Sequence, residues 1–461
     1  MSHTKIMIVG AGPAGYVAAI RAAQLGVEVS LIEEARVGGT CLNRGCIPTK
    51  SLLASTEALS LIRGAKKLGI EVDRIKPDFI RMMQRKNGIV SQLRKGVEYL
   101  LKANKVKLMK GKASFLNLHR IEVETPEGKE KIEGDSTIIA TGSKPILLPF
   151  IDLNHPAVLT SEGALELAQI PQSLLIVGAG VIGCEFASIF SPLGTQITMV
   201  EMMDRILPQE DKRISLMMKQ ILQKREIRIF THTRLEAITD YQKDSLTARL
   251  DNGEKVSAEK MLVCVGRSPY TDHLGLENLD LRLDQKGNIV VNERMQTNQE
   301  SVYAAGDVVG GFLLAHVAFE EGIVAAEDAL GVDSKIDYTS IPNCIFTSPQ
   351  IGTVGLTLDK ARAEGIEAKT SRFPFSASGK AQALGETDGF VQLVVEEENG
   401  RILGGQIIGP HAADLVHEIA LAIRWELTVD EIGSTCHAHP TLSEAVMEAA
   451  KKAQGKPIHL T

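Results

Sequence analysis

The sequence is poor in aromatic residues and has neither a long apolar run nor a long block of like charge. Phe, Trp and Tyr make up 4% of its 461 residues. No stretch approaches the roughly 18 apolar residues that a transmembrane helix requires, so we expect no membrane association. The 51 Lys and Arg residues and 57 Asp and Glu residues leave a net charge of −6. This mildly acidic balance gives no electrostatic reason to expect nucleic acid or an anionic membrane as a partner.

Cysteines are few and, with one exception, far apart in the sequence. They are Cys41, Cys46, Cys184, Cys264, Cys344 and Cys436. Only the first two lie close together, which excludes the disulfide scaffold of a small secreted domain. No second pair at ligand spacing completes a zinc site, so we expect no bound metal. Cys184 and Cys264 lie in apolar contexts typical of buried thiols.

The N-terminus also lacks the features of a secretory leader. MSHTKIMIVGAG runs directly into a predicted strand and glycine turn, without a basic stretch, a bare apolar run or a cleavage site. We therefore predict a cytoplasmic protein. A composition of 44% hydrophobic and 23% charged residues is that of a soluble globular chain. Its length predicts about three domains, at roughly 150 residues per domain.

What the sequence does contain is one pattern repeated twice. Residues 5–33 and 173–201 each read as an apolar strand, a GxGxxG turn, an amphipathic helix, a glycine break and a second strand ending in Glu. The third glycine and that Glu are 18 positions apart in both copies. This is the βαβ dinucleotide-binding pattern. A single GxGxxG could be a bare glycine turn, but two complete copies in the same register argue against that alternative.

Each glycine of the pattern has its own expected role. The first makes the tight turn, the second lets the backbone approach a pyrophosphate, and the third allows close packing of helix on strand. In that order they are Gly10, Gly12 and Gly15 in the first copy and Gly178, Gly180 and Gly183 in the second. Glu33 and Glu201 would bind ribose hydroxyls, and Glu201 favours NAD over NADP because a carboxylate repels a 2′-phosphate.

Two further apolar segments end in small-residue turns, STIIATGSKP at 136–145 and VYAAGDVVG at 302–310. Each fits a strand that returns to a nucleotide-binding sheet, with Gly142 in the first turn and Asp307 after Gly306 in the second. A carboxylate at Asp307 could hold a polyol chain. Either segment alone is a generic turn, but together with the two glycine patterns they suggest two bound dinucleotides, one of them FAD.

The segment GGTCLNRGCIPTKSLL carries the redox chemistry. Cys41 and Cys46 are five positions apart, which on an ideal helix separates their Cα atoms by roughly 8–9 Å. A disulfide tolerates at most about 7 Å, so the pair requires a distorted helix, which Gly45 permits. Strained disulfides are the labile, catalytic kind, and a helix N-terminus favours the thiolate. Lys50, one turn after Cys46, could point its ammonium at a flavin. The alternatives are two inert thiols and a solvated lysine.

The C-terminal segment CHAHPTLSEAVMEAAKKA offers a proton carrier. It predicts a loop and then a helix opened by Pro440 and Thr441. Histidine side chains ordinarily titrate near neutral pH, which makes His439 a candidate base for deprotonating a thiol, and Glu444 could orient its ring. The alternative is a surface histidine pair, His437 and His439, that caps a helix.

These segments resemble the pyridine nucleotide–disulfide oxidoreductases, and within that family the branch that acts on lipoamide. The resemblance covers essentially the whole chain, through GGTCLNRGCIPTK, both glycine patterns, IIATGSKP, AAGDV, LLAHVAFEEG, IFTSPQIGTVGLT and HAHPTLSE in family order. Departures are modest. SPQ at 348–350 replaces a more usual threonine or histidine followed by Pro-Glu, and Cys344 and Cys436 are extra thiols that could affect oxidation sensitivity.

The resemblance implies the following site. FAD would contact Glu33, Thr40, Lys50 near the flavin N5, Ala113 at the adenine, Gly142, Asp307 on the ribityl chain and Ala315 at the pyrimidine edge. NAD would contact Glu201, Leu235 and Gly266, and Glu185 would pair with Lys50. Cys41 would exchange with the substrate, and Cys46 would face the flavin. His439 with Glu444 would act on the other subunit of a homodimer.

The resemblance also implies the fold and the reaction. We expect an α/β fold with two Rossmann-like dinucleotide-binding domains and an α+β C-terminal dimerisation domain. The FAD domain would span 1–145 and 271–340, the NAD domain 146–270 and the interface domain 341–461. The substrate would be a dihydrolipoyl group on a separate lipoyl carrier, oxidised with NAD⁺ as final acceptor.

Two other functions remain open. A related reductase could act on another disulfide or on mercuric ion, although Glu201 disfavours a glutathione-type enzyme and the ending KPIHLT lacks a mercuric-type cysteine pair. A non-enzymatic nucleotide-binding assembly subunit would keep the glycine turns, but it has no use for the cysteine pair.

Overall fold

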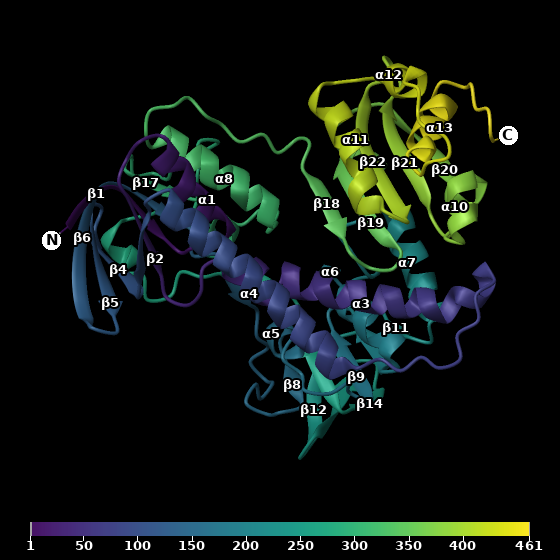
Figure 1. Ribbon diagram of the computed structural model, residues 1–461, viewed down its shortest axis with the longest axis horizontal. Helices are drawn as coiled ribbons and strands as arrows, with labels where there is room; N and C mark the ends of the chain where they lie inside the picture. Colours follow the sequence, from purple (N-terminus) through teal and green to yellow (C-terminus); the bar gives the residue numbers. More distant parts are fainter. Residues whose placement is uncertain (1, 461) are drawn as a thin grey trace.

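Three large sheets organise the molecule, a computed structural model that describes residues 2–460 (Figure 1). The first sheet, in purple and blue, lies beside the N-terminus. The second, in teal, lies below it, and the third, in yellow-green, carries the C-terminus at the opposite side of the molecule. Two long helices, α3 (Cys46–Gly64) and α4 (Phe79–Ala103), cross the middle of the view.

The first sheet contains the first glycine pattern. Its strands are, in spatial order, β3 (Lys107–Lys110), β2 (Val29–Glu33), β1 (Ser2–Val9), β6 (Gly128–Ile139), β5 (Arg120–Thr125) and β4 (Lys112–Asn117), and β17 (Val302–Ala304) also pairs with β6. Strands β3, β2, β1, β6 and β17 pair in parallel. Ile6, Met7 and Ile8 are fully buried, as expected for a parallel strand covered on both faces. Helices α1 (Pro13–Gln24) and α8 (Ala315–Asp328) pack against each other beside the sheet.

The second sheet repeats this arrangement around the second glycine pattern. Its five parallel strands are β11 (Arg228–Phe230), β10 (Gln196–Val200), β9 (Ser173–Val177), β15 (Lys260–Val263) and β8 (Val158–Leu159). Its helices are α5 (Ser161–Ala164), α6 (Val181–Phe190) and α7 (Lys212–Lys224), and an antiparallel sheet of β12 (Leu235–Gln242), β13 (Ser245–Leu250) and β14 (Lys255–Ala258) lies beside it. A two-stranded ribbon of β7 (Ser143–Pro145) and β16 (Arg267–Pro269) connects the first two regions.

The third sheet is antiparallel, which completes the predicted combination of two Rossmann-like units and one α+β unit. Its strands are β18 (Pro342–Ile345), β19 (Gln350–Gly355), β22 (Ile402–Gly409), β21 (Phe390–Glu396) and β20 (Ala368–Pro374). Helices α9 (Leu358–Ala363), α10 (Gly379–Leu384), α11 (Ala412–Arg424), α12 (Val429–Ser434) and α13 (Glu444–Ala453) surround it. The predicted fold class is therefore confirmed.

The last helix differs from the prediction in where it begins. It starts at Glu444, after a cis His439–Pro440 peptide bond, and not at Pro440. The segment before Glu444 instead forms a turn held by Thr441, whose N–H donates to the Glu444 carboxylate at 2.8 Å. The Thr441 hydroxyl donates to the Ala438 carbonyl, 2.7 Å away.

Within residues 2–460, none of the helices combines the length and the apolar character needed to cross a membrane.

Candidate active site

One continuous cavity of about 2840 Å³ reaches both glycine turns and both cysteines. A typical small-molecule pocket occupies roughly 300–1,000 Å³, so this cavity has room for two dinucleotides. The predicted residues that line it are Gly10, Gly12, Glu33, Thr40, Cys41, Cys46, Lys50, Ala113, Gly142, Gly178, Gly180, Glu185, Glu201, Leu235, Gly266, Asp307 and Ala315. Gly15 and Gly183 do not line it, and neither do His439 and Glu444.

The three glycines of the first turn differ in what an added Cβ would meet. Gly10 has φ +98°, and a Cβ there would lie 2.4 Å from the Ala140 carbonyl oxygen. A Cβ on Gly15 would lie 1.8 Å from the Gly10 carbonyl oxygen, so helix α1 could not pack. At Gly12 the nearest atom to an added Cβ is the Gly39 Cα, 3.8 Å away. The second glycine therefore leaves open backbone facing the cavity, which fits an approaching pyrophosphate of FAD.

The second turn has the same geometry. A Cβ on Gly178 would lie 2.5 Å from the Cys264 carbonyl oxygen, and one on Gly183 would lie 2.1 Å from the Gly178 carbonyl oxygen. At Gly180 an added Cβ would meet no atom within 4 Å. Packing within the chain thus requires the first and third glycines, whereas the second is open toward the space that NAD would occupy.

The two acidic strand ends are held in matching positions. Glu33 accepts hydrogen bonds from the backbone N–H groups of Ala11 at 2.7 Å and Ala35 at 2.8 Å. Glu201 accepts from Ala179 at 2.8 Å and from Met203 at 2.9 Å. Each carboxylate oxygen retains a further acceptor site, which a ribose hydroxyl can use. Burial raises the pKa of Glu33 despite its two backbone bonds.

The helix that carries the cysteine pair is broken between them. Helix α2 (Gly39–Arg44) ends before Gly45, which has φ −142° and ψ −110°, and α3 begins at Cys46. This break is the distortion that the five-residue spacing requires. Both thiols are free. The interaction between the two thiols lowers the pKa of Cys46 and raises that of Cys41, and Lys50 lowers the Cys46 pKa further. Of the two thiols, Cys46 is therefore the one that ionises more readily.

An ion pair joins Lys50 to helix α6, which follows the second glycine turn. The Lys50 Nζ lies 2.8 Å and 2.9 Å from the two carboxylate oxygens of Glu185 on α6. Glu185 is 4% exposed and also accepts the backbone N–H of Phe346 at 3.0 Å. The Phe346 ring lies 4.7 Å from the Lys50 Nζ, a cation–π distance. Sequence reasoning did not find Phe346, because only the folded third sheet brings it here.

Asp307 has two partners that sequence reasoning also missed. The Ser143 hydroxyl donates to its Oδ2, and the Arg267 Nε donates to the Ser143 Oγ at 2.7 Å. Ser143 directly follows Gly142, and Arg267 directly follows Gly266. The signal that could have found them is the paired small-residue turn in the two segments, TGS and VGR, which become the ribbon of β7 and β16.

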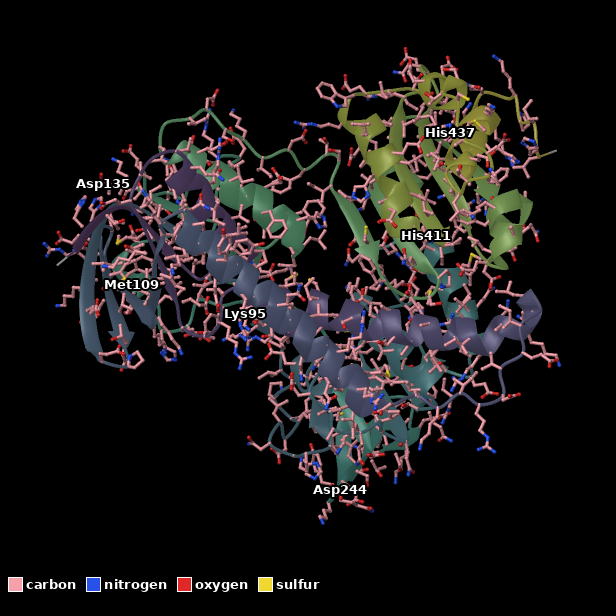
Figure 2. The ribbon with its side chains drawn as sticks, viewed as in Figure 1. Lys95, Met109, Asp135, Asp244, His411 and His437 are labelled. Carbon is pink, nitrogen blue, oxygen red and sulfur yellow. The ribbon has the colours of Figure 1, made fainter. Side chains whose placement is uncertain are left out.

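His439 and Glu444 contact each other far from the cysteines of the same chain. The His439 Nδ1 lies 2.9 Å from the Glu444 Oε1, and the imidazole is 78% exposed. Burial alone would raise the pKa of Glu444, but the Thr441 N–H and His439 bring it below its ordinary value. Figure 2 shows the neighbouring His437 high on the third-sheet region, well away from α3. One chain alone therefore does not bring His439 to Cys41.

The comparisons with known proteins agree with this geometry. The family described as pyridine nucleotide-disulphide oxidoreductase matches residues 4–322, and the dimerisation domain of that family matches residues 341–450. The chain belongs to this family. It is a flavoprotein disulfide oxidoreductase that uses FAD and NAD(H), and its dimerisation domain supports a homodimer.

Individual relatives are similar over almost their full length. Proteins named dihydrolipoyl dehydrogenase from Bacillus subtilis, Geobacillus stearothermophilus and Halobacterium salinarum are 43%, 41% and 44% identical, covering 98%, 99% and 99% of this chain and 98%, 98% and 97% of theirs. Among solved structures, LpdA from Mycobacterium tuberculosis superposes with a TM-score of 0.91 at 29% identity, covering 98% of this chain and 99% of that one. The flavoprotein disulfide reductase RclA from Escherichia coli gives 0.86 at 28%, covering 96% and 98%.

Proposed function

We propose that this enzyme is a dihydrolipoamide dehydrogenase, which oxidises dihydrolipoyl groups to lipoyl groups and passes the electrons to NAD⁺. The observation that carries the proposal is the Cys41–Cys46 pair, placed across a helix break beside Lys50 in a cavity shared by both glycine turns. Relatives of this name that match the whole chain support the choice of substrate.

In the proposed cycle, His439 of the partner subunit removes a proton from one substrate thiol. The resulting thiolate attacks the Cys41 sulfur of the oxidised pair. The Cys41–Cys46 bond breaks and Cys46 leaves as a thiolate, which Lys50 stabilises. The imidazolium returns the first proton to the Cys41 sulfur, which leaves as a thiol when the second substrate sulfur attacks the mixed disulfide. The proton of that second thiol passes to the freed His439 imidazole. The substrate is thereby oxidised to a disulfide and the enzyme pair is reduced to a dithiol.

In the resulting dithiol we expect the proton on Cys41 and the charge on Cys46, because the pKa of Cys41 is raised and that of Cys46 is lowered. FAD, held at the first glycine turn and Glu33, would accept the electron pair, and NAD⁺, held at the second turn and Glu201, would carry it away as hydride. The chain's own contribution at this stage is to hold Cys46 ionised, with Lys50 fixed by Glu185.

Complementation between two inactive variants tests both the chemistry and the partner base. Cys41→Ser and His439→Gln should each abolish dihydrolipoamide oxidation while FAD stays bound. In a mixed dimer, one of the two sites combines an intact Cys41 with an intact His439 from the other chain. Random mixing at equal amounts should therefore restore about a quarter of wild-type activity. No recovery from verified mixed dimers would refute a base from the partner subunit.

The substrate choice has its own test. If NADH reduces the flavin but dihydrolipoamide does not, the cysteine chemistry remains and the substrate is another disulfide.

We further propose that the lipoyl group is carried by a separate protein of a 2-oxo acid dehydrogenase or glycine cleavage complex. We place the enzyme in the cytoplasm.

A further inference from the structure

A buried carboxylate outside the catalytic groups ties the second sheet to the third. Glu210 is 8% exposed and accepts hydrogen bonds from the Asn343 Nδ2 at 2.7 Å and the Thr353 Oγ1 at 3.0 Å. Asn343 and Thr353 are direct partners across the antiparallel pair of β18 and β19. One carboxylate therefore clamps two neighbouring strands of the third sheet from the same face.

Glu210 belongs to the segment that leaves the pyridine nucleotide site. Its backbone N–H donates to the Leu207 carbonyl at 3.0 Å, and the Leu207 N–H donates to the Ala179 carbonyl at 2.8 Å. Ala179 lies inside the second glycine turn, and its own N–H donates to Glu201. Occupation of that turn by a pyrophosphate therefore acts on the backbone to which Glu210 is attached.

The C-terminal end of strand β18 leads to the residues that hold Lys50 and Glu185 beside the cysteine pair. β18 runs from Pro342 to Ile345, and the next residue, Phe346, donates its N–H to Glu185 and places its ring over Lys50. The distance from Asn343 to Phe346 is three residues, or about 10 Å of extended chain. A shift of β18 therefore changes the hydrogen bond that helps fix Glu185.

We propose that Glu210 is a positioning residue that couples occupation of the pyridine nucleotide site to the Lys50–Glu185 pair through β18. The inference rests on the proposed function only for the direction of electron flow. Its physical content is a coupling between dinucleotide binding and the ionisation of Cys46, and such couplings are reciprocal.

The test measures that coupling in the intact flavoprotein without turnover. Dithionite adds two electrons, and the long-wavelength charge-transfer absorbance of the Cys46 thiolate with the flavin is then measured as a function of pH. The titration is repeated with ADP-ribose, which fills the dinucleotide site but has no ring to accept hydride. In the wild type we expect ADP-ribose to change the proton affinity of Cys46 by about threefold or more. Because dithionite replaces dihydrolipoamide, failure of the proposed substrate would leave this result intact.

Three variants distinguish a specific coupling through Glu210 from a general loss of structure. Glu210→Ala should abolish the effect of ADP-ribose. Glu210→Gln should retain it, because an amide can accept from Asn343 and donate to the Thr353 oxygen. Lys212→Ala is the matched control, since it breaks the neighbouring exposed contact between the same two regions, Lys212 to Asp359 at 3.0 Å, and should leave the effect unchanged.

Two results would overturn the proposal. One is a wild-type titration that ADP-ribose does not move, and the other is an equal movement in Glu210→Ala. If Glu210→Ala does not fold, Thr353→Val removes one donor of the clamp at nearly constant volume. That variant must then show a smaller movement than the wild type, and an unchanged movement counts against the relay.

Discussion

The ion pair beside the cysteines makes a prediction whose sign distinguishes electrostatics from structural damage. Lys50 lowers the pKa of Cys46, whereas the Glu185 carboxylate raises it. Replacing Lys50 by Met should therefore raise the Cys46 pKa, and replacing Glu185 by Gln should lower it. Glutamine keeps an acceptor for the Phe346 N–H, so the Glu185→Gln change removes charge with little loss of hydrogen bonding.

The size of the Lys50 effect on Cys46 follows from the helix geometry. Residues four apart on a helix lie about 6 Å from each other, and one unit charge at that distance contributes about 3 kcal/mol at an effective dielectric constant of about 20. The Lys50 side chain is 30% exposed, so solvent screening reduces this figure. We expect Lys50→Met to raise the Cys46 pKa by about one unit and Glu185→Gln to lower it by somewhat less. In the double variant the two shifts should largely cancel.

The assay is the pH dependence of thiolate absorbance in the ultraviolet, taken as the difference between each variant and the same variant carrying Cys46→Ser. Thiol alkylation rates across the same pH range provide an independent check. Retained flavin absorbance would show that each variant still folds around its cofactor. A Cys46 pKa that rises in both single variants would refute the electrostatic account, because loss of structure moves both in the same direction.

Two further predictions concern groups that the proposed cycle does not use directly. Glu321 on α8 is 3% exposed, and burial raises its pKa to about 7 although the Tyr338 hydroxyl and the Gly306 N–H donate to it. Between pH 4.5 and about 7 the folded protein therefore binds more protons at this site than the unfolded chain. The free energy of unfolding should consequently fall by up to about 3 kcal/mol as the pH rises through that window. Glu321→Gln should remove this slope from the pH dependence of the denaturant midpoint, and an unchanged slope would exclude Glu321 as its source. Gly180→Ala should fold normally and bind FAD but raise the KM for NAD⁺, because the added Cβ would point into the space expected for the nucleotide. Gly183→Ala should fail to fold, because its Cβ would lie 2.1 Å from the Gly178 carbonyl oxygen. Equal folding yields for the two glycine variants would contradict this division of roles.

The sequence predicts local features of the site well because each depends on a short stretch of chain. Residues at most five positions apart form the helix break at Gly45, the contact of His439 with Glu444 and the close approach of the third glycine to the first in each turn. These features follow from steric limits and helix geometry.

Contacts between distant segments could not be derived in that way. Lys50 and Glu185 are 135 positions apart, and only the resemblance to a family indicated their pairing. No sequence pattern indicated the contacts of Phe346, Arg267 and Glu210. Their partners depend on how the ribbon of β7 and β16 and the third sheet pack against the first two sheets. The sequence also misplaced the start of the last helix, because a turn at Pro440 and Thr441 delays it to Glu444.

The contact of α3 with α6 explains why the cysteine pair must lie where it does. Helix α3 begins at Cys46, whose charge the cycle requires, and α6 begins directly after Gly180, the glycine open to the nucleotide. Lys50 and Glu185 each lie about one turn into their helix, and they meet where the two helices pack. The group that stabilises the thiolate is thus fixed by α6, the helix that we propose binds the electron acceptor. A change at either helix start must therefore act on both halves of the reaction.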